Sequence, residues 1–190
     1  MSESAATRAR LLEAARELFT TTGYHASTTP MIATRAGVAE GTIYRHFASK
    51  QALLNAAWQE VQQWGIATVR EVLALTDLNA GERLNRLGRR WLECAEHDAP
   101  RARMLVATRF AAELDEASRQ RAAELHGALE QLIARGKQEG LVRPGVVQLW
   151  TAVWLALVAF AIERVASREW TATHSHAVAT LGAAWDAIAR

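Results

Sequence analysis

The chain has 190 residues, half of them hydrophobic, and a formal net charge of only +2. This length suits one large domain or a small domain fused to a larger one, and the hydrophobic content excludes a disordered chain. The near balance of charge excludes a uniformly basic surface, so an anionic partner has to be met by a local patch. The small basic excess lies in the first 50 residues.

The single cysteine, Cys94, cannot form an internal disulfide, and the sequence does not open with a signal-peptide pattern. We therefore expect a cytoplasmic protein. The longest apolar run, at residues 149–162, is shorter than the roughly 20 residues that cross a bilayer. We expect it to be a buried helix, and we expect no membrane partner.

Helix-favouring residues dominate and no segment alternates like a strand, which predicts an all-α fold of about nine helices. Proline and glycine signals separate the segments. The expected helices lie at about residues 5–21, 30–37, 40–46, 50–75, 82–97, 101–113, 115–139, 146–168 and 173–189. Because no flexible linker occurs, the long helix beginning at Lys50 is expected to join the two ends of the chain rigidly.

Residues 28–50, TTPMIATRAGVAEGTIYRHFASK, contain the signals of two short helices. Thr29 is suited to cap a helix whose first position is Pro30, and Gly37 can end that helix in a left-handed conformation. A second short helix follows at about residues 40–46. Two short helices joined by a turn that contains glycine form a helix-turn-helix, whose second helix can enter a DNA major groove.

The second short helix has one apolar face, because Ile43 and Phe47 are four residues apart. The residues left on the outer face are Gly41, Thr42 and Arg45, with parts of Tyr44 and His46. Glycine lets the backbone come close to the groove, and threonine can contact a base edge or a thymine methyl group.

Ser49 is suited to cap the next helix, which places Lys50 in its first turn, where the helix dipole disfavours a cation by about 0.3–1 kcal/mol. A phosphate bound there reverses that cost. We therefore predict that Lys50→Ala weakens binding to DNA of any sequence and leaves thermal stability nearly unchanged.

These residues resemble the TetR family of bacterial transcriptional regulators. The resemblance lies in LLEAARELFTTTGYHASTT and IATRAGVAEGTIYRHFASKQALL, within about residues 8–58. It implies a helix-turn-helix DNA-binding domain at residues 1–48 and a helical ligand-binding and dimerisation domain at residues 49–190. The resemblance and the faces of the two short helices together assign a set of residues to DNA binding. These residues are Thr28, Thr29, Arg35, Gly41, Thr42, Tyr44, Arg45, His46 and Lys50.

Two positions depart from the family pattern. Ala39 stands where similar proteins often have serine, so a side-chain cap and a phosphate contact are lost. Pro30 stands where some relatives have a longer side chain that reaches a base. The resemblance therefore leaves base reading to the second helix of the motif.

The C-terminal part offers an interface and a pocket. The apolar helix at 146–168 and the last helix predict a four-helix interface in a homodimer, whose symmetry sets two recognition helices about 34 Å apart on a palindromic operator. Ligand cavities between helices are mostly apolar and aromatic. The candidate ligand-binding residues are Trp64, Trp91, Cys94, Phe110, Glu113, Trp154 and Val158. For any single tryptophan, packing in the core or an interface is favoured over a place in the pocket.

Neither a metal site, a cofactor motif nor a catalytic constellation is visible, so we do not expect an enzyme. The leading hypothesis is a repressor released from double-stranded DNA by a small apolar or aromatic effector. The alternative is a dimeric DNA-binding protein whose C-terminal part serves only assembly or protein contact. The sequence does not identify the effector, the operator, the regulated genes, the sign of regulation or the number of dimers on each operator.

Overall fold

The computed structural model describes residues 3–190, and within them the chain forms nine α-helices and only an isolated β-bridge between Val142 and Ala189. The helices are α1 (Glu3–Thr21), α2 (Thr29–Ala36), α3 (Glu40–His46), α4 (Lys50–Leu73), α5 (Ala80–His97), α6 (Ala99–Leu105), α7 (Glu116–Gln138), α8 (Val147–Ala166) and α9 (Ser175–Asp186). The prediction of an all-α fold is confirmed.

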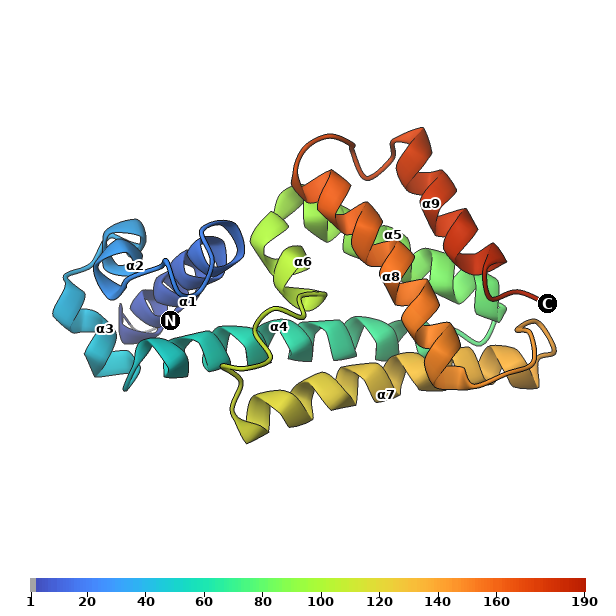
Figure 1. The fold of residues 1–190 in the computed structure, drawn as a ribbon, viewed down its shortest axis with the longest axis horizontal. Helices are drawn as coiled ribbons and strands as arrows, with labels where there is room; N and C mark the ends of the chain where they lie inside the picture. Colours follow the sequence, from blue (N-terminus) through green and yellow to red (C-terminus); the bar gives the residue numbers. More distant parts are fainter. Residues whose placement is uncertain (1–2) are drawn as a thin grey trace.

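The helices form a small head and a larger body, joined by α4 (Figure 1). Helices α1, α2 and α3 lie together at one end, and α4 runs from them along the body. Helix α7 lies along α4, while α5, α8 and α9 pack on one another, and α5 and α8 extend back to α6. Helix α6 contacts α1, α4, α5 and α8, so it lies where head and body meet.

Local signals position the two short helices of the head. Gly37 adopts φ 66° and ψ 41° after α2, as the sequence predicted, and this left-handed conformation is one that a β-carbon disfavours. The prediction that Thr29 caps α2 was wrong by one residue. Thr28 is the cap, with its hydroxyl accepting a 3.4 Å hydrogen bond from the main-chain N–H of Met31. The hydroxyl of Thr29 is therefore free for other contacts.

The expected helix at residues 101–113 is the largest error. Helix α6 ends at Leu105, and residues 106–115 form a turning segment that we call the junction segment. Asn55 of α4 holds this segment: its Oδ1 accepts a 2.9 Å bond from the main-chain N–H of Asp115, and its Nδ2 donates to the main-chain oxygen of Glu113 at 3.1 Å. These side-chain bonds replace the bonds that a continued helix would supply.

Helix α8 buries one face and leaves another open. Trp154, Val158 and Ile162 are almost fully buried, whereas Leu149 and Phe160 are about half exposed in the single chain. With 20 residues and a mean hydropathy of 1.7, α8 is long and apolar enough to cross a membrane, a property that core helices of soluble proteins share. Within one chain, α8 is thus buried on one face and open on another, which leaves the open face for the partner-chain contact expected from its composition.

Candidate nucleic-acid interface and ligand cavity

Helix α3 has one face buried in the head and one polar face exposed to solvent. Ile43 is fully buried and Phe47 nearly so, as the four-residue spacing predicted. Tyr44 is 55% exposed, and Gly41 and Arg45 are exposed beside it. The helix begins after Ala39, which supplies no side-chain cap. The N–H of Thr42 donates to the main-chain oxygen of Ala39 at 2.9 Å, so within the first turn the N–H groups of Glu40 and Gly41 are the ones left to an anionic oxygen.

The hydroxyl of Thr29 connects α2 to α3. It donates to the carboxylate of Glu40 at 3.3 Å and lies 3.3 Å from the hydroxyl of Tyr44. This exposed cluster fixes the ring of Tyr44 beside the start of α2. It also places one carboxylate on the face that was predicted to contact DNA, a cost that the positive end of α3 offsets in part.

The start of α1 also contributes to this face, which sequence reasoning missed. Glu3, Ser4 and Thr7 line a shallow surface groove together with Thr42, Arg45 and His46 of α3, so the groove also carries one carboxylate. Two hydroxyl side chains beside a helix that carries Arg45 are suited to phosphate oxygens. Nothing in the local sequence of α1 signals this proximity, because it arises only when α1 packs in the head.

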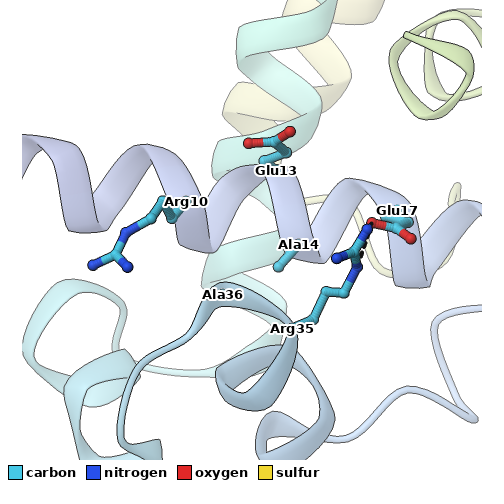
Figure 2. A pocket seen from close by; sticks show the side chains of 6 residues that line it. All are labelled: Arg10, Glu13, Ala14, Glu17, Arg35 and Ala36. Atoms are coloured by element: carbon cyan, nitrogen blue, oxygen red, sulfur yellow. Dashed lines mark hydrogen bonds and ion pairs between the residues drawn. The ribbon is translucent and has the colours of Figure 1, made fainter.

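Arg35 turns from the candidate DNA face toward α1. Figure 2 shows its guanidinium reaching Glu17, to which it donates from Nε at 2.7 Å and from Nη2 at 2.6 Å. The hydrogen bond and charge of Glu17 raise the pKa of Arg35 above its ordinary value. Both groups are at least one-third exposed, so the pair is an ordinary surface ion pair, and a DNA contact by Arg35 would have to compete with it.

Lys50 is bound to the protein rather than free at the helix start. Ser49 caps α4 as predicted, accepting a 3.0 Å bond from Ala52 N–H. The ammonium of Lys50 donates to the main-chain oxygens of Tyr24 and Ser27, each at 2.9 Å, and lies 4.3 Å from the centre of the Tyr24 ring. Lys50 thus joins α4 to the loop between α1 and α2, and these contacts argue against the expectation that Lys50→Ala leaves thermal stability nearly unchanged.

The junction segment contacts the head directly. Arg109 donates from Nη2 to the main-chain oxygen of Thr20, at the end of α1, at 2.6 Å. Glu113 pairs with His25 at 2.9 Å across the same boundary. Burial raises the pKa of Tyr24 above its ordinary value, and the negative charge of Glu113 adds to this effect. Glu113, the polar candidate for ligand binding, thus has one carboxylate oxygen paired with the head, while its Oε2 is buried without a hydrogen-bond partner among the described residues.

A small cavity of about 60 Å³ lies in the body between α4, α5, α7, α8 and the junction segment. Its lining is mostly apolar and contains no Asp, Glu, Lys or Arg. The residues that line it are Trp58, Gln62, Trp91, Leu105, Val106, Ala107, Thr108, Ala122, Leu125, His126 and Leu155. Of the candidate ligand-binding residues, Trp91 is the member that lines this cavity.

Two other candidates pack immediately behind the lining. Trp154 contacts Trp91 with ring centroids 5.9 Å apart, and Phe110 meets Trp58 edge to face at 6.0 Å. Both are about 1% exposed and belong to the core. They can therefore shape the cavity without touching its contents.

The remaining candidates lie elsewhere in the body. Trp64 is half-buried under the guanidinium of Arg101, and Val158 is fully buried in α8. Burial, with a further contribution from Asp98, raises the pKa of the Cys94 thiol to about 11. This thiol is therefore protonated at neutral pH and is a poor nucleophile and metal ligand.

Gly65 brings the cavity wall against α4. A β-carbon there would lie 2.5 Å from Leu105 and 3.2 Å from Leu125, two residues that line the cavity. The side chain of Gln62 adds a 3.3 Å bond to the main-chain oxygen of Leu105. The helix that begins at the head is thus packed closely on the wall. Among residues 3–190, no group of three or more metal-ligating side chains gathers at this or any other place.

Comparison with known proteins places the head in a family. Residues 11–57 match the family described as bacterial regulatory proteins, tetR family. The chain is 39% identical over 70 residues to the transcriptional regulator UidR of Escherichia coli, covering 37% of this chain and 36% of that protein. It is 35% identical over 106 residues to the transcriptional activator FasR of Mycolicibacterium smegmatis, covering 56% and 48%. The chain thus aligns with between about a third and a half of the length of these relatives.

The likeness to solved structures extends well beyond the head. A crystal structure of a bacterial regulatory protein in the tetR family from Rhodococcus superposes with a TM-score of 0.79 at 20% sequence identity, covering 99% of this chain and 98% of the other. At this identity the likeness establishes the arrangement of the nine helices seen here in residues 3–190, and it carries no information about ligands.

Proposed function

Because residues 11–57 belong to the tetR family of bacterial regulatory proteins, we propose that this chain is a transcriptional regulator whose α3 binds in the DNA major groove. The observation that carries the proposal is the polar face of α3, with Thr42, Tyr44 and Arg45 outward and Ile43 buried beneath them. Thr42 and Tyr44 contact bases or sugars, and Arg45, His46 and the uncapped start of α3 contact phosphates.

The open face of α8 supports a homodimer. Its half-exposed Leu149 and Phe160 would be costly to leave in water, at about 25 cal/mol for each Å² of apolar surface. On the adjacent α9, Ala179 and Ala183 are exposed and an added β-carbon at Gly182 would meet open space. Small side chains let two helices approach closely, so α8 and α9 of two copies form a four-helix interface. Two heads related by this symmetry then read a palindromic operator.

The effector acts through contacts that lead from the cavity to the head. Val106, Ala107 and Thr108 line the cavity, and the next residue, Arg109, holds the end of α1. A molecule that binds only one arrangement of these residues shifts the population of head positions. In this proposal a small apolar or aromatic molecule releases a repressor from its operator.

The competing function is a dimeric DNA-binding protein with no small-molecule ligand. The cavity of about 60 Å³ favours it, because pockets for small molecules usually measure about 300–1,000 Å³. The two functions differ in one measurable respect: only the first has operator binding that responds to a compound which also raises the unfolding temperature.

The test begins with DNA. Selection of random duplexes by the purified protein is expected to return a palindrome with half-sites about one helical turn apart. Tyr44→Ala should lower the affinity of the protein for the selected duplex. The chain's other tyrosine, Tyr24, is unsuitable as a control because its ring packs against the ammonium of Lys50. Gln138→Ala, an exposed change at the end of α7, is the matched control. Failure to enrich any duplex at low salt would overturn the proposal.

A reporter assay on the bound promoter measures whether the protein represses or activates transcription. This measurement is needed because one relative, FasR, is named an activator.

A further inference from the structure

The two tryptophans that line the body cavity differ in how their indole N–H groups are satisfied. Trp91 donates from Nε1 to the hydroxyl of Thr68 at 3.0 Å. Trp58 is only 4% exposed, and its Nε1 is buried without an acceptor among the described residues. A buried N–H group without a partner is uncommon and costs free energy, so it calls for a physical explanation.

We propose that the cavity binds an uncharged, mainly apolar molecule carrying a hydrogen-bond acceptor, and that this acceptor binds the indole N–H of Trp58. The inference rests on the proposed function, since the molecule would be the effector of the regulator. A carbonyl or ether oxygen meets the requirement. A carboxylate fits less well, because the lining contains no Lys or Arg, and its single imidazole, His126, is exposed and already lies 3.0 Å from the main-chain oxygen of Ala122.

The size of the cavity determines how such a molecule is held. About 60 Å³ accommodates only a few heavy atoms, so a larger molecule has to displace part of the wall. Gly65 packs Leu105 and Leu125 tightly, whereas the non-helical residues Val106 and Ala107 are only half-buried. The molecule therefore extends past these residues toward the exposed side chain of Thr108.

The chain offers a direct test, because its seven tryptophan indoles give separate signals in ¹H–¹⁵N spectra of the full-length protein. Trp58→Phe removes one signal and thereby identifies it. The probes are cyclohexanone and methylenecyclohexane, which have nearly the same shape and differ in the acceptor oxygen. We expect cyclohexanone to move the Trp58 indole proton downfield and methylenecyclohexane to leave it nearly in place.

Affinities provide the second readout. Trp58→Phe should weaken cyclohexanone binding by about threefold to tenfold, the effect of one hydrogen bond, and leave methylenecyclohexane binding nearly unchanged. Trp91→Phe is the matched control, because its N–H already has an acceptor, and it should alter both probes alike. Benzothienylalanine at position 58, which keeps the bicyclic shape without the N–H, replaces Trp58→Phe if that variant does not fold.

Three results would overturn the inference. These are equal binding of the two probes, an unmoved Trp58 signal at tens of millimolar cyclohexanone, and tighter binding of cyclohexanecarboxylate than of cyclohexanone. None of these measurements involves DNA. A protein that binds cyclohexanone through Trp58 but no duplex would refute the regulatory function alone, and a protein that binds its operator but neither probe would refute this inference alone.

Discussion

Arg109 donates a 2.6 Å hydrogen bond to the main-chain oxygen of Thr20, and so attaches the junction segment to the last turn of α1. Carbonyl groups in the last turn of a helix lack intrahelical partners and lie at its negative end, where a guanidinium is favourable. We expect Arg109→Ala to loosen the head on the body. Amide hydrogen exchange in the last turn of α1 should become about tenfold faster, the equivalent of a bond of roughly 1.4 kcal/mol.

Arg119→Ala is the control for this experiment. Arg119 donates to the main-chain oxygen of Leu114 in the same junction segment, and its other hydrogen bonds and ion pair among the described residues go to Glu116 of α7 rather than to the head. Equal exchange rates in the two variants would mean that Arg109 does not restrain the head.

Lys50→Met should destabilise the protein by about 1–3 kcal/mol, since it removes two hydrogen bonds from a charged group to the oxygens of Tyr24 and Ser27. Urea unfolding at constant m-value measures this loss. Lys137→Met is the control, because that ammonium bonds only an exposed turn at Gly145. An unfolding free energy equal to that of the unsubstituted protein, together with lost DNA binding, would return Lys50 to the purely phosphate-binding role expected from its sequence position.

The contrast between Gly37 and Lys50 shows which structural features could be predicted from the sequence and which could not. The turn at Gly37 and the buried pair Ile43 and Phe47 are specified by residues within a few positions of one another, and the structure confirms them. The partners of Lys50 lie 23 and 26 residues away in the chain. Without knowing how α1 packs, nothing indicates that its ammonium is already occupied.

The same limit applies to the junction segment and the cavity. Residues 106–115 read as helix because their composition favours one, but Asn55, 60 residues earlier than Asp115, supplies the competing bonds. The close packing of the cavity wall on Gly65 and the unpaired N–H of Trp58 appear only when α4 packs against α6 and α7. Seven tryptophans indicate an aromatic body, and they do not indicate which of them lacks a partner.

Arg45→Ala should weaken DNA binding to all duplexes and lower the slope of log affinity against log salt by about one unit, the effect of one lost phosphate contact. Arg45 is exposed on α3 and makes no side-chain bond or ion pair among the described residues. Fluorescence anisotropy at several salt concentrations measures the slope. Arg89→Ala, an exposed arginine on α5, should leave it unchanged. A change confined to one base sequence would instead assign Arg45 to base reading.

Phe160→Asp should separate the proposed dimer, because it places a charge on the open face of α8, where Phe160 is 46% exposed. Sedimentation velocity should give a monomer for this variant and a dimer for the unsubstituted protein. Met31→Asp, a similar change at an exposed apolar residue of the head, is the control and should remain dimeric. Two dimeric variants would exclude this face as the interface.

Glu139 makes stability depend on pH in the acid range. Its carboxylate accepts bonds from Arg83 Nη1 at 2.7 Å and from Ala80 N–H at 2.9 Å. Burial raises the pKa of Glu139, but these bonds and the charges of Arg83 and Arg135 outweigh it and hold the pKa below the ordinary value of 4.5. Because the folded pKa is the lower one, the stabilisation is complete above about pH 4.5 and is lost as the pH falls through the folded value.

Glu139→Gln should therefore flatten the fall of unfolding free energy between about pH 5 and pH 3. At neutral pH it should cost about 1–3 kcal/mol, since Arg83 is only 1% exposed and would keep its charge without a carboxylate. Glu116→Gln is the control, because its carboxylate is 85% exposed and pairs only at the surface with Arg119. If both variants unfold with the same dependence on pH, the acid sensitivity arises from another carboxylate.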